Sequence, residues 1–142
     1  MAQTITLGCR LNFAESEAIR ALAGDDAIIV NSCAVTNEAV RQTRQAIRRA
    51  HREAPEKRVI VTGCAAQLDP MSFAAMPEVA KVIGNADKYR ATAFTSENKV
   101  IVSDVMTAPA PPVAAGFLAR VRSFVAVQTG CDHRCTFCSI WQ

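Results

Sequence analysis

The feature of this sequence that most constrains its fold is a recurring order in which a short apolar run is followed by a helical stretch. Residues 4–7, 27–30, 58–62, 79–83 and 100–102 have the composition of strands. The run 27–30 is apolar throughout, which is typical of a strand buried in a parallel sheet. Because strands that alternate with helices are joined by parallel crossovers, the order predicts an α/β fold with a doubly wound parallel sheet.

The helices between these strands are predicted from apolar residues at helical spacing and from capping residues. We expect helices over residues 14–23, 37–53, 71–76 and 87–94. Asn12, followed by Glu15, is predicted to cap the first helix as in a capping box. Thr36 or Asn37 is predicted to cap the second, and Asp69 the third.

A proline-rich stretch divides the chain. Pro109, Pro111 and Pro112 stand among alanines, which is typical of a linker. We therefore predict a domain over residues 1–106, a linker over 107–117 and the start of a second domain over 118–142. Because the sequence stops four residues after Cys138, we also expect the chain to be a fragment of a longer protein.

Three cysteines, Cys131, Cys135 and Cys138, lie on one loop after a predicted strand over residues 123–129. Three thiolates can hold three irons of a 4Fe–4S cluster and leave the fourth iron open to another ligand. Zinc is an alternative, with His133 as a fourth ligand, although structural zinc sites seldom have this spacing. A disulfide would leave one thiol over. The spacing favours a cluster and leaves zinc and structural or redox cysteine open.

The other three cysteines, Cys9, Cys33 and Cys64, each follow an apolar strand by one to three residues. In a parallel sheet these positions lie at the carboxyl edge, so the thiols meet if the three strands are neighbours. Taken singly, each is typical of a small buried apolar residue. Taken together, beside a second loop with three thiols, they favour a second iron–sulfur site with three cysteine ligands.

Composition bounds the location and the partners. A net charge of +3 on 142 residues permits nucleic-acid binding without requiring it. The N-terminus has no charged segment followed by an apolar run, so neither a signal peptide nor a membrane span is predicted. We therefore expect a cytoplasmic protein, with no membrane partner, whose six cysteines are reduced, metal-bound or catalytic.

The loop of Cys131, Cys135 and Cys138 resembles the signature of the radical S-adenosylmethionine superfamily, including the aromatic Phe137 before the last cysteine. Residues 8–12, 31–37 and 61–67 resemble three blocks of the methylthiotransferase N-terminal domain. The resemblance thus spans nearly the whole chain. It implies that the predicted second domain begins an α/β barrel, of which this chain would contain the first strand.

The resemblance also implies the cofactors. The loop cluster would bind S-adenosylmethionine through its open iron and cleave it reductively to a 5′-deoxyadenosyl radical. The cluster of Cys9, Cys33 and Cys64 would carry the sulfur, methylated by a second S-adenosylmethionine, to an unactivated carbon. An electron donor such as flavodoxin or ferredoxin is implied as a partner. We assign no catalytic side chain: His51 and His133 are isolated.

Residues 34–37 and 41–45 are most similar to the branch of the family that acts on N6-threonylcarbamoyladenosine in tRNA. The predicted activity is therefore addition of a methylthio group at C2 of that nucleoside, with tRNA as the partner. Alternatives are the branches that act on isopentenyladenosine in tRNA or on a ribosomal-protein aspartate, a non-catalytic iron–sulfur module, and a zinc-stabilised α/β domain. As a fragment, the chain by itself would be inactive.

Four arginines, Arg41, Arg44, Arg48 and Arg52, fall on one face of the second predicted helix. They could contact tRNA phosphates or form a solvated helix face, and the second interpretation is favoured. Asn12 and Gln67 lie near the predicted cysteine edge, where their amides could orient thiolates or substrate.

Overall fold

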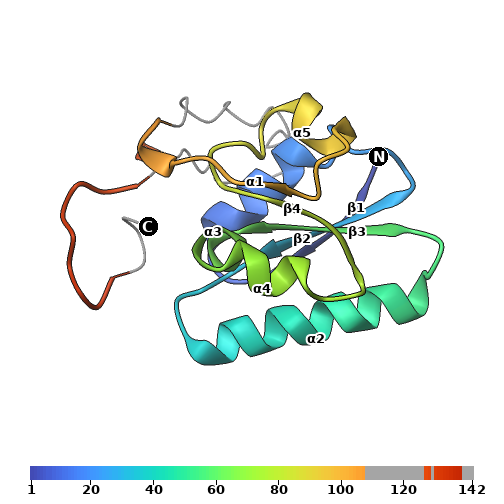
Figure 1. Cartoon of the computed structure of the whole chain (residues 1–142), viewed down its shortest axis with the longest axis horizontal. Coiled ribbons are helices and arrows are strands. Elements are labelled where there is room, and N and C mark those ends of the chain that lie inside the picture. Colours follow the sequence, from blue (N-terminus) through green and yellow to red (C-terminus); the bar gives the residue numbers. More distant parts are fainter. Residues whose placement is uncertain (108–126, 129, 139–142) are drawn as a thin grey trace.

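A computed structural model describes residues 1–107, 127–128 and 130–138 of the chain. Its centre is a five-stranded sheet in which every strand pair is parallel and the strands follow one another in sequence order (Figure 1). The strands are β1 (Gln3–Thr6), β2 (Ala27–Ser32), β3 (Arg58–Gly63), β4 (Val79–Ile83) and β5 (Val100–Ile101). All five predicted strands of the first domain are present, with bounds shifted by no more than two residues at either end.

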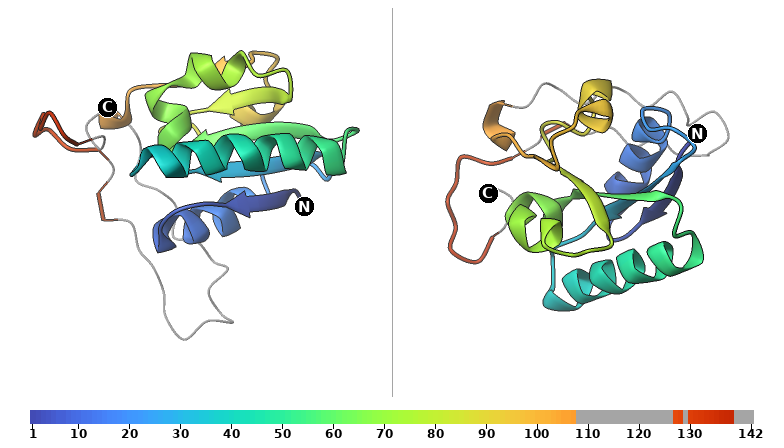
Figure 2. Two further views of the ribbon diagram at one scale, coloured as in Figure 1. Left: turned by 90° about the horizontal axis from the view of Figure 1, so that it is seen from below. Right: turned by 45° about the vertical axis from the view of Figure 1, so that its right-hand side comes forward.

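The helices cover both faces of the sheet (Figures 1 and 2). They are α1 (Arg10–Ile19), α2 (Asn37–Glu53), α3 (Cys64–Leu68), α4 (Pro70–Ala74), α5 (Ala91–Thr95) and a 3₁₀ turn η1 (Val105–Thr107). The prediction of a doubly wound parallel α/β sheet is therefore confirmed. In the described part of the chain, no helix has both the length and the apolar character needed to cross a membrane.

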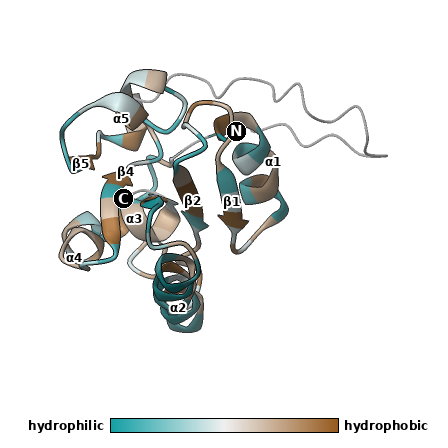
Figure 3. Cartoon of the chain, turned by 90° about the vertical axis from the view of Figure 1, so that its right-hand side faces the viewer, coloured by the Kyte–Doolittle hydropathy of each residue, from teal (hydrophilic) through white to brown (hydrophobic). Residues whose placement is uncertain are grey.

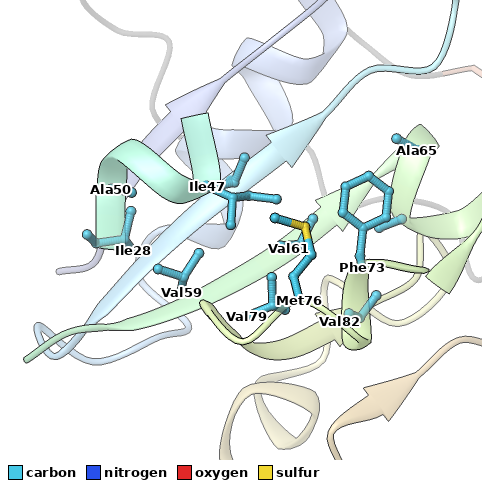
Figure 4. Packing of buried hydrophobic residues seen from close by; sticks show 12 residues of the cluster. Ile28, Ile47, Ala50, Val59, Val61, Ala65, Phe73, Met76, Val79 and Val82 are labelled. Carbon is cyan, nitrogen blue, oxygen red and sulfur yellow. The ribbon is translucent and has the colours of Figure 1, made fainter. Parts of the chain in front are cut away.

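The core is divided by the sheet into two layers because successive strand residues point to opposite faces. On one face, α2 and α4 pack against β2, β3 and β4 through Ile47, Phe73 and Val61, among others (Figure 4). On the other face, α1 and α5 contribute Ile19 and Phe94 against the alternate strand positions. In Figure 3, β2 is hydrophobic and lies inside, whereas α2, on the outside, is mostly hydrophilic.

Two of the predicted helix caps are confirmed. The side chain of Thr36 accepts a hydrogen bond from the Ala39 amide at the start of α2, 3.1 Å away. Asp69 does the same for Ser72 in α4, at 3.2 Å.

The predicted start of the first helix is wrong. The helix begins at Arg10, with Cys9 in the N-cap position, and it ends at Ile19 rather than at residue 23. Asn12 lies inside the helix and is 4% exposed, so it does not cap it. Its amide instead donates to two carbonyl groups at strand ends, and these tertiary bonds outweigh its local preference for a cap.

Two further helical details differ from prediction. The sequence pattern did not indicate α3, which starts at Cys64 directly after β3. Over the predicted helix 87–94, the chain forms turns first, and only Ala91–Thr95 is helical. The predicted linker and the predicted strand 123–129 lie outside the described residues, apart from Thr107, Val127 and Gln128.

Candidate functional site

Three cysteines lie where three neighbouring strands end. Cys9 follows β1 by three residues, whereas Cys33 and Cys64 directly follow β2 and β3. The order β1-β2-β3 makes the three strands adjacent, and their register pairs Thr6 with Asn31 and Ser32 with Gly63. The sequence-based condition for convergence, that the three strands be neighbours, is therefore met.

The backbone around these cysteines is closely packed. Gly8 has a φ of +93°, and a Cβ on it would lie 2.7 Å from the sulfur of Cys33. Gly63 has a φ of +94°, and a Cβ there would lie 2.6 Å from Oδ1 of Asn31. Both positions require glycine, for the positive φ and for the close approach. The two turns thereby bring Cys9 and Cys64 next to the end of β2.

The electrostatic surroundings of Cys64 also indicate that the thiols lie near one another. Although Cys64 has exposed surface, the protein around its thiol partly desolvates it and so raises its pKa; the Lys88 ammonium partly opposes that effect. The Glu15 carboxylate and then the thiols of Cys33 and Cys9 raise the pKa further. Cys33 is buried, whereas Cys9 and Cys64 are exposed, so a bound group would be held between a buried ligand and two accessible ones.

Asn12 connects two of the strand ends. Its side-chain nitrogen donates to the carbonyl oxygens of Leu7, 2.7 Å away, and Ser32, 3.1 Å away. Each acceptor lies one or two residues before a cysteine. Its Oδ1 atom accepts a hydrogen bond from the thiol of Cys9 at 3.7 Å. The structure therefore brings Asn12 to the cysteine edge, as the sequence suggested.

Gln67 has a different role from the one considered for it. Its side-chain nitrogen donates to the carbonyl oxygen of Ser103 at 3.2 Å, and its Oε1 accepts from the Asn85 amide at 2.9 Å. Gln67 thus joins α3 to the segments after β4 and β5.

A buried polar cluster lies on the α1 side of the same edge, and sequence reasoning missed it. Lys88 and Glu15 form an ion pair with 2.7 Å between Nζ and Oε2. Asn31 donates to Glu15 at 3.4 Å and to Ser16 at 3.2 Å. The polar residue Asn31 inside an apolar strand was the available signal, because a buried amide needs partners. Nothing in the local pattern marked Lys88.

The donor set fits an iron–sulfur cluster. Thiolates are the protein ligands of such clusters, and three cysteines lie at the ends of three adjacent strands. Among the described residues, no three His, Cys, Asp or Glu side chains are arranged around a single metal ion. Cluster ligands bind different irons and need not approach one point. Two fully buried oxygens next to the cysteine turns, Oδ1 of Asn31 and Oγ1 of Thr62, have no hydrogen-bond partner within the described ranges of the chain.

The loop cysteines are accessible. Cys131 and Cys138 are partly exposed and Cys135 is exposed, and the Cys138 amide donates to the Cys135 carbonyl at 3.1 Å. Gly130, with a φ of +79°, starts the loop; a Cβ there would lie 3.1 Å from the sulfur of Met106. Figures 1 and 2 show the loop on the side of the sheet where the strands end.

The arginine face of α2 is largely engaged within the chain. The contacts are Arg41 with Glu38 at 2.6 Å, Arg48 with Glu78 at 4.0 Å, and Arg44 with Ser72 at 2.5 Å and with the ring of Phe73. These contacts agree with a structural, solvated helix face. Contact with tRNA phosphates stays a prediction.

Residues 2–84 match the model of a family described as uncharacterized protein family UPF0004. This match covers more than half of the chain and all three strand-end cysteines. The chain belongs to the UPF0004 family. The matched segment runs from β1 to Gly84, just past the end of β4, so the family corresponds to the part of the sheet that carries the candidate site.

The chain is similar in sequence to several methylthiotransferases. The chain is 45% identical over 145 residues to the threonylcarbamoyladenosine tRNA methylthiotransferase MtaB of Rickettsia prowazekii, with 97% of this chain covered. It is 35% identical to the protein of the same name from Bacillus subtilis, over 95% of its length. It is also 31% identical, over 81% of its length, to the ribosomal protein uS12 methylthiotransferase RimO of Azoarcus.

These alignments cover only part of the relatives. The chain spans 34% of the length of both MtaB proteins and 26% of the RimO protein. The family is therefore established for the chain, while the activity of a whole protein is a matter of inference.

Proposed function

We propose that this chain is the cluster-binding part of a tRNA methylthiotransferase that adds a methylthio group to C2 of N6-threonylcarbamoyladenosine next to the anticodon. The proposal is supported by the 45% identity to an MtaB protein and by the three thiols at adjacent strand ends. The proposed activity belongs to the whole enzyme, since the chain corresponds to about a third of these relatives. Its proposed location is the cytoplasm.

The proposed division of the chain follows the sequence. Residues 1–106 form the methylthiotransferase N-terminal domain, 107–117 a linker, and 118–142 the start of a radical S-adenosylmethionine barrel. In this proposal the loop cysteines hold one 4Fe–4S cluster with S-adenosylmethionine, and the strand-end cysteines hold a second. The loop cysteines are Cys131, Cys135 and Cys138, and the strand-end cysteines are Cys9, Cys33 and Cys64.

When bound, the two clusters and S-adenosylmethionine would supply the radical and the methylthio group, with electrons from a flavodoxin or ferredoxin. The chain's own residues hold and shield the site. Cys33 offers a buried ligand, while Cys9 and Cys64 remain accessible. Asn12 ties the ends of β1 and β2 together and so limits how far Cys9 can move from Cys33. Preorganisation of this kind lowers the cost of assembling the ligands.

The observation that carries the proposal is that three cysteines far apart in sequence lie at the ends of three adjacent strands. It predicts a specific result in anaerobic reconstitution with iron and sulfide. The unaltered chain should bind about eight irons, as two 4Fe–4S clusters require. A variant with Cys9, Cys33 and Cys64 replaced by alanine should retain about four, and so should a variant with the loop cysteines replaced.

His133 supplies a matched control for this experiment. It lies between Cys131 and Cys135 but is not a ligand in the cluster proposal. His133→Ala should leave the iron content unchanged and the visible absorption intact. A colourless chain that binds one zinc tightly, and loses it in His133→Ala, would overturn the proposal in favour of a zinc-stabilised domain.

The substrate is tested separately, because the RimO similarity favours a second candidate, a ribosomal-protein aspartate. The whole enzyme, reduced and supplied with S-adenosylmethionine, is incubated with tRNA carrying threonylcarbamoyladenosine, tRNA carrying isopentenyladenosine, or ribosomal protein uS12. Mass spectrometry of nucleosides and peptides locates the methylthio group. Modification of threonylcarbamoyladenosine alone is expected; modification of either other substrate instead would overturn the proposed specificity.

A further inference from the structure

The Glu15–Lys88 ion pair is buried near the strand-end cysteines, close enough for both charges to act on the thiol of Cys64. The Lys88 side chain is 4% exposed and that of Glu15 is 12% exposed, and their charged atoms are 2.7 Å apart. Lys88 also donates to Oδ1 of Asn85 at 3.0 Å. Glu15 is positioned by α1 and Lys88 by the turn after β4, so the pair bridges the first helix and the fourth strand across the sheet edge.

A short chain of contacts connects this pair to the cysteines. Asn31, fully buried near the end of β2, donates to Glu15 at 3.4 Å. The oxygen of the same amide lies so close to Gly63 that a Cβ there would be 2.6 Å away. Gly63 immediately precedes Cys64, and Asn31 precedes Cys33 by two residues. Both charges act on the thiol of Cys64, with opposite signs.

A buried ion pair adds little net stability to a fold, because desolvating two ions offsets much of their attraction. Its position near a ligand site therefore suggests a functional role. Three thiolate ligands bring negative charge to this edge, and one-electron reduction of a bound cluster adds another. Nearby charges and hydrogen bonds set the reduction potential of an iron–sulfur cluster. A buried ammonium favours the reduced, more negative form, and a buried carboxylate disfavours it.

We propose that Glu15 and Lys88 are positioning residues that set the reduction potential of the cluster held by Cys9, Cys33 and Cys64. Lys88 stabilises the electron that an external donor delivers, and Glu15 limits that stabilisation while holding the ammonium in place. This inference depends on the proposed function, since it requires a cluster at these cysteines. Neither residue contacts substrate in this proposal.

The experiment isolates the strand-end cluster. In a chain whose loop cysteines Cys131, Cys135 and Cys138 are replaced by alanine, the remaining cluster is titrated anaerobically against dithionite and followed by electron paramagnetic resonance. Lys88→Met should shift the midpoint to lower potential, and Glu15→Gln should shift it to higher potential. The double variant, which removes both charges, should lie between the two single variants.

Lys81→Met is the matched control. Lys81 is also a buried lysine, 5% exposed, but it donates to backbone carbonyls of α5, including that of Ala93 at 3.1 Å. Its replacement should leave the midpoint potential unchanged. If Lys88→Met does not fold, Lys88→Gln removes the same charge with a polar side chain, and Lys88→Arg, which keeps the charge, is its reference.

The outcomes separate the two proposals. Shifts of opposite sign in the two single variants support the inference, as does a potential that is kept by Lys88→Arg but lowered by Lys88→Gln. Equal potentials in all variants, or shifts of the same sign, overturn it while the cluster itself remains. If the unaltered strand-end cysteines bind no cluster, the proposed function fails instead, and the iron analysis shows this before any potential is measured.

Discussion

Asn12 in α1 donates a hydrogen bond to the carbonyl oxygen of Ser32 at the end of β2, with 3.1 Å between the two atoms. A second bond from the same nitrogen reaches Leu7, two residues before Cys9. One amide therefore connects the two chain segments that lead into Cys9 and Cys33. Its loss would free both segments at once.

Asn12→Ala should lower both stability and cluster retention. Removing the amide deletes both of these hydrogen bonds, and a buried group left unsatisfied costs about 1–3 kcal/mol. We expect the free energy of unfolding, measured by denaturant titration, to fall by about 2 kcal/mol. Asn98→Ala, at an exposed position, is the control and should change stability little. Equal effects of the two substitutions would contradict the role assigned to Asn12.

Gly8→Ala should disrupt the cysteine edge. The added Cβ would lie 2.6 Å from the Cβ of Cys33, at a φ of +93° that alanine rarely adopts. Such backbone strain costs about 1–3 kcal/mol, and displacement of Cys33 adds to it. A lower melting temperature and reduced iron content are expected. Gly24→Ala is the comparison, because its new Cβ meets only the end of the exposed Asp26 side chain; it should retain iron fully.

Much of the fold was predictable from local patterns because the strands are apolar and short. The fully buried strand β2 and the capped helix α2 both follow from residue type and spacing. To predict that Cys9, Cys33 and Cys64 share one sheet edge required one further assumption, that successive strands lie side by side. The strand order confirms that assumption.

What could not be predicted depends on tertiary contacts. Asparagine is a residue type typical of helix caps, but Asn12 lies inside the helix, where its side chain forms hydrogen bonds to Leu7 and Ser32. A lysine in a predicted helix is expected to be exposed, but Lys88 is buried in an ion pair with Glu15. Ser32 and Glu15 lie on other elements, far away in sequence, so no local window of sequence contains these two contacts. The occupancy of the cysteine sites stays a prediction.

Arg44→Ala should destabilise α2, whereas Arg52→Ala should not. The guanidinium of Arg44 lies 4.6 Å from the centre of the Phe73 ring and donates to Ser72. Stacking on an aromatic ring contributes about 0.5–1 kcal/mol, and the hydrogen bond adds a similar amount. Thermal unfolding of both variants tests this. Should Arg52→Ala prove the more destabilising, the solvated face of α2 would need another description.

Tyr89 should resist ionisation until the chain unfolds. Burial raises the pKa of its hydroxyl group, and the Glu15 carboxylate, by its charge and by a hydrogen bond, raises it further. The unfolded chain has a tyrosine pKa of about 10. Because the folded pKa is higher, this contribution to stability is complete below about pH 10 and is lost as the pH rises toward the folded value.

Because Tyr89 is the only tyrosine in the chain, the tyrosinate absorbance reports on this residue alone. Tyrosinate absorbance, followed against pH together with circular dichroism, should appear only as the fold is lost. Glu15→Gln should lower the folded pKa of Tyr89, because the buried carboxylate that opposes a second negative charge is gone. Tyr89→Phe should unfold at a higher pH than the unaltered chain. If the absorbance shows that Tyr89 ionises near pH 10 while the circular dichroism is still native, Glu15 does not act on it as described.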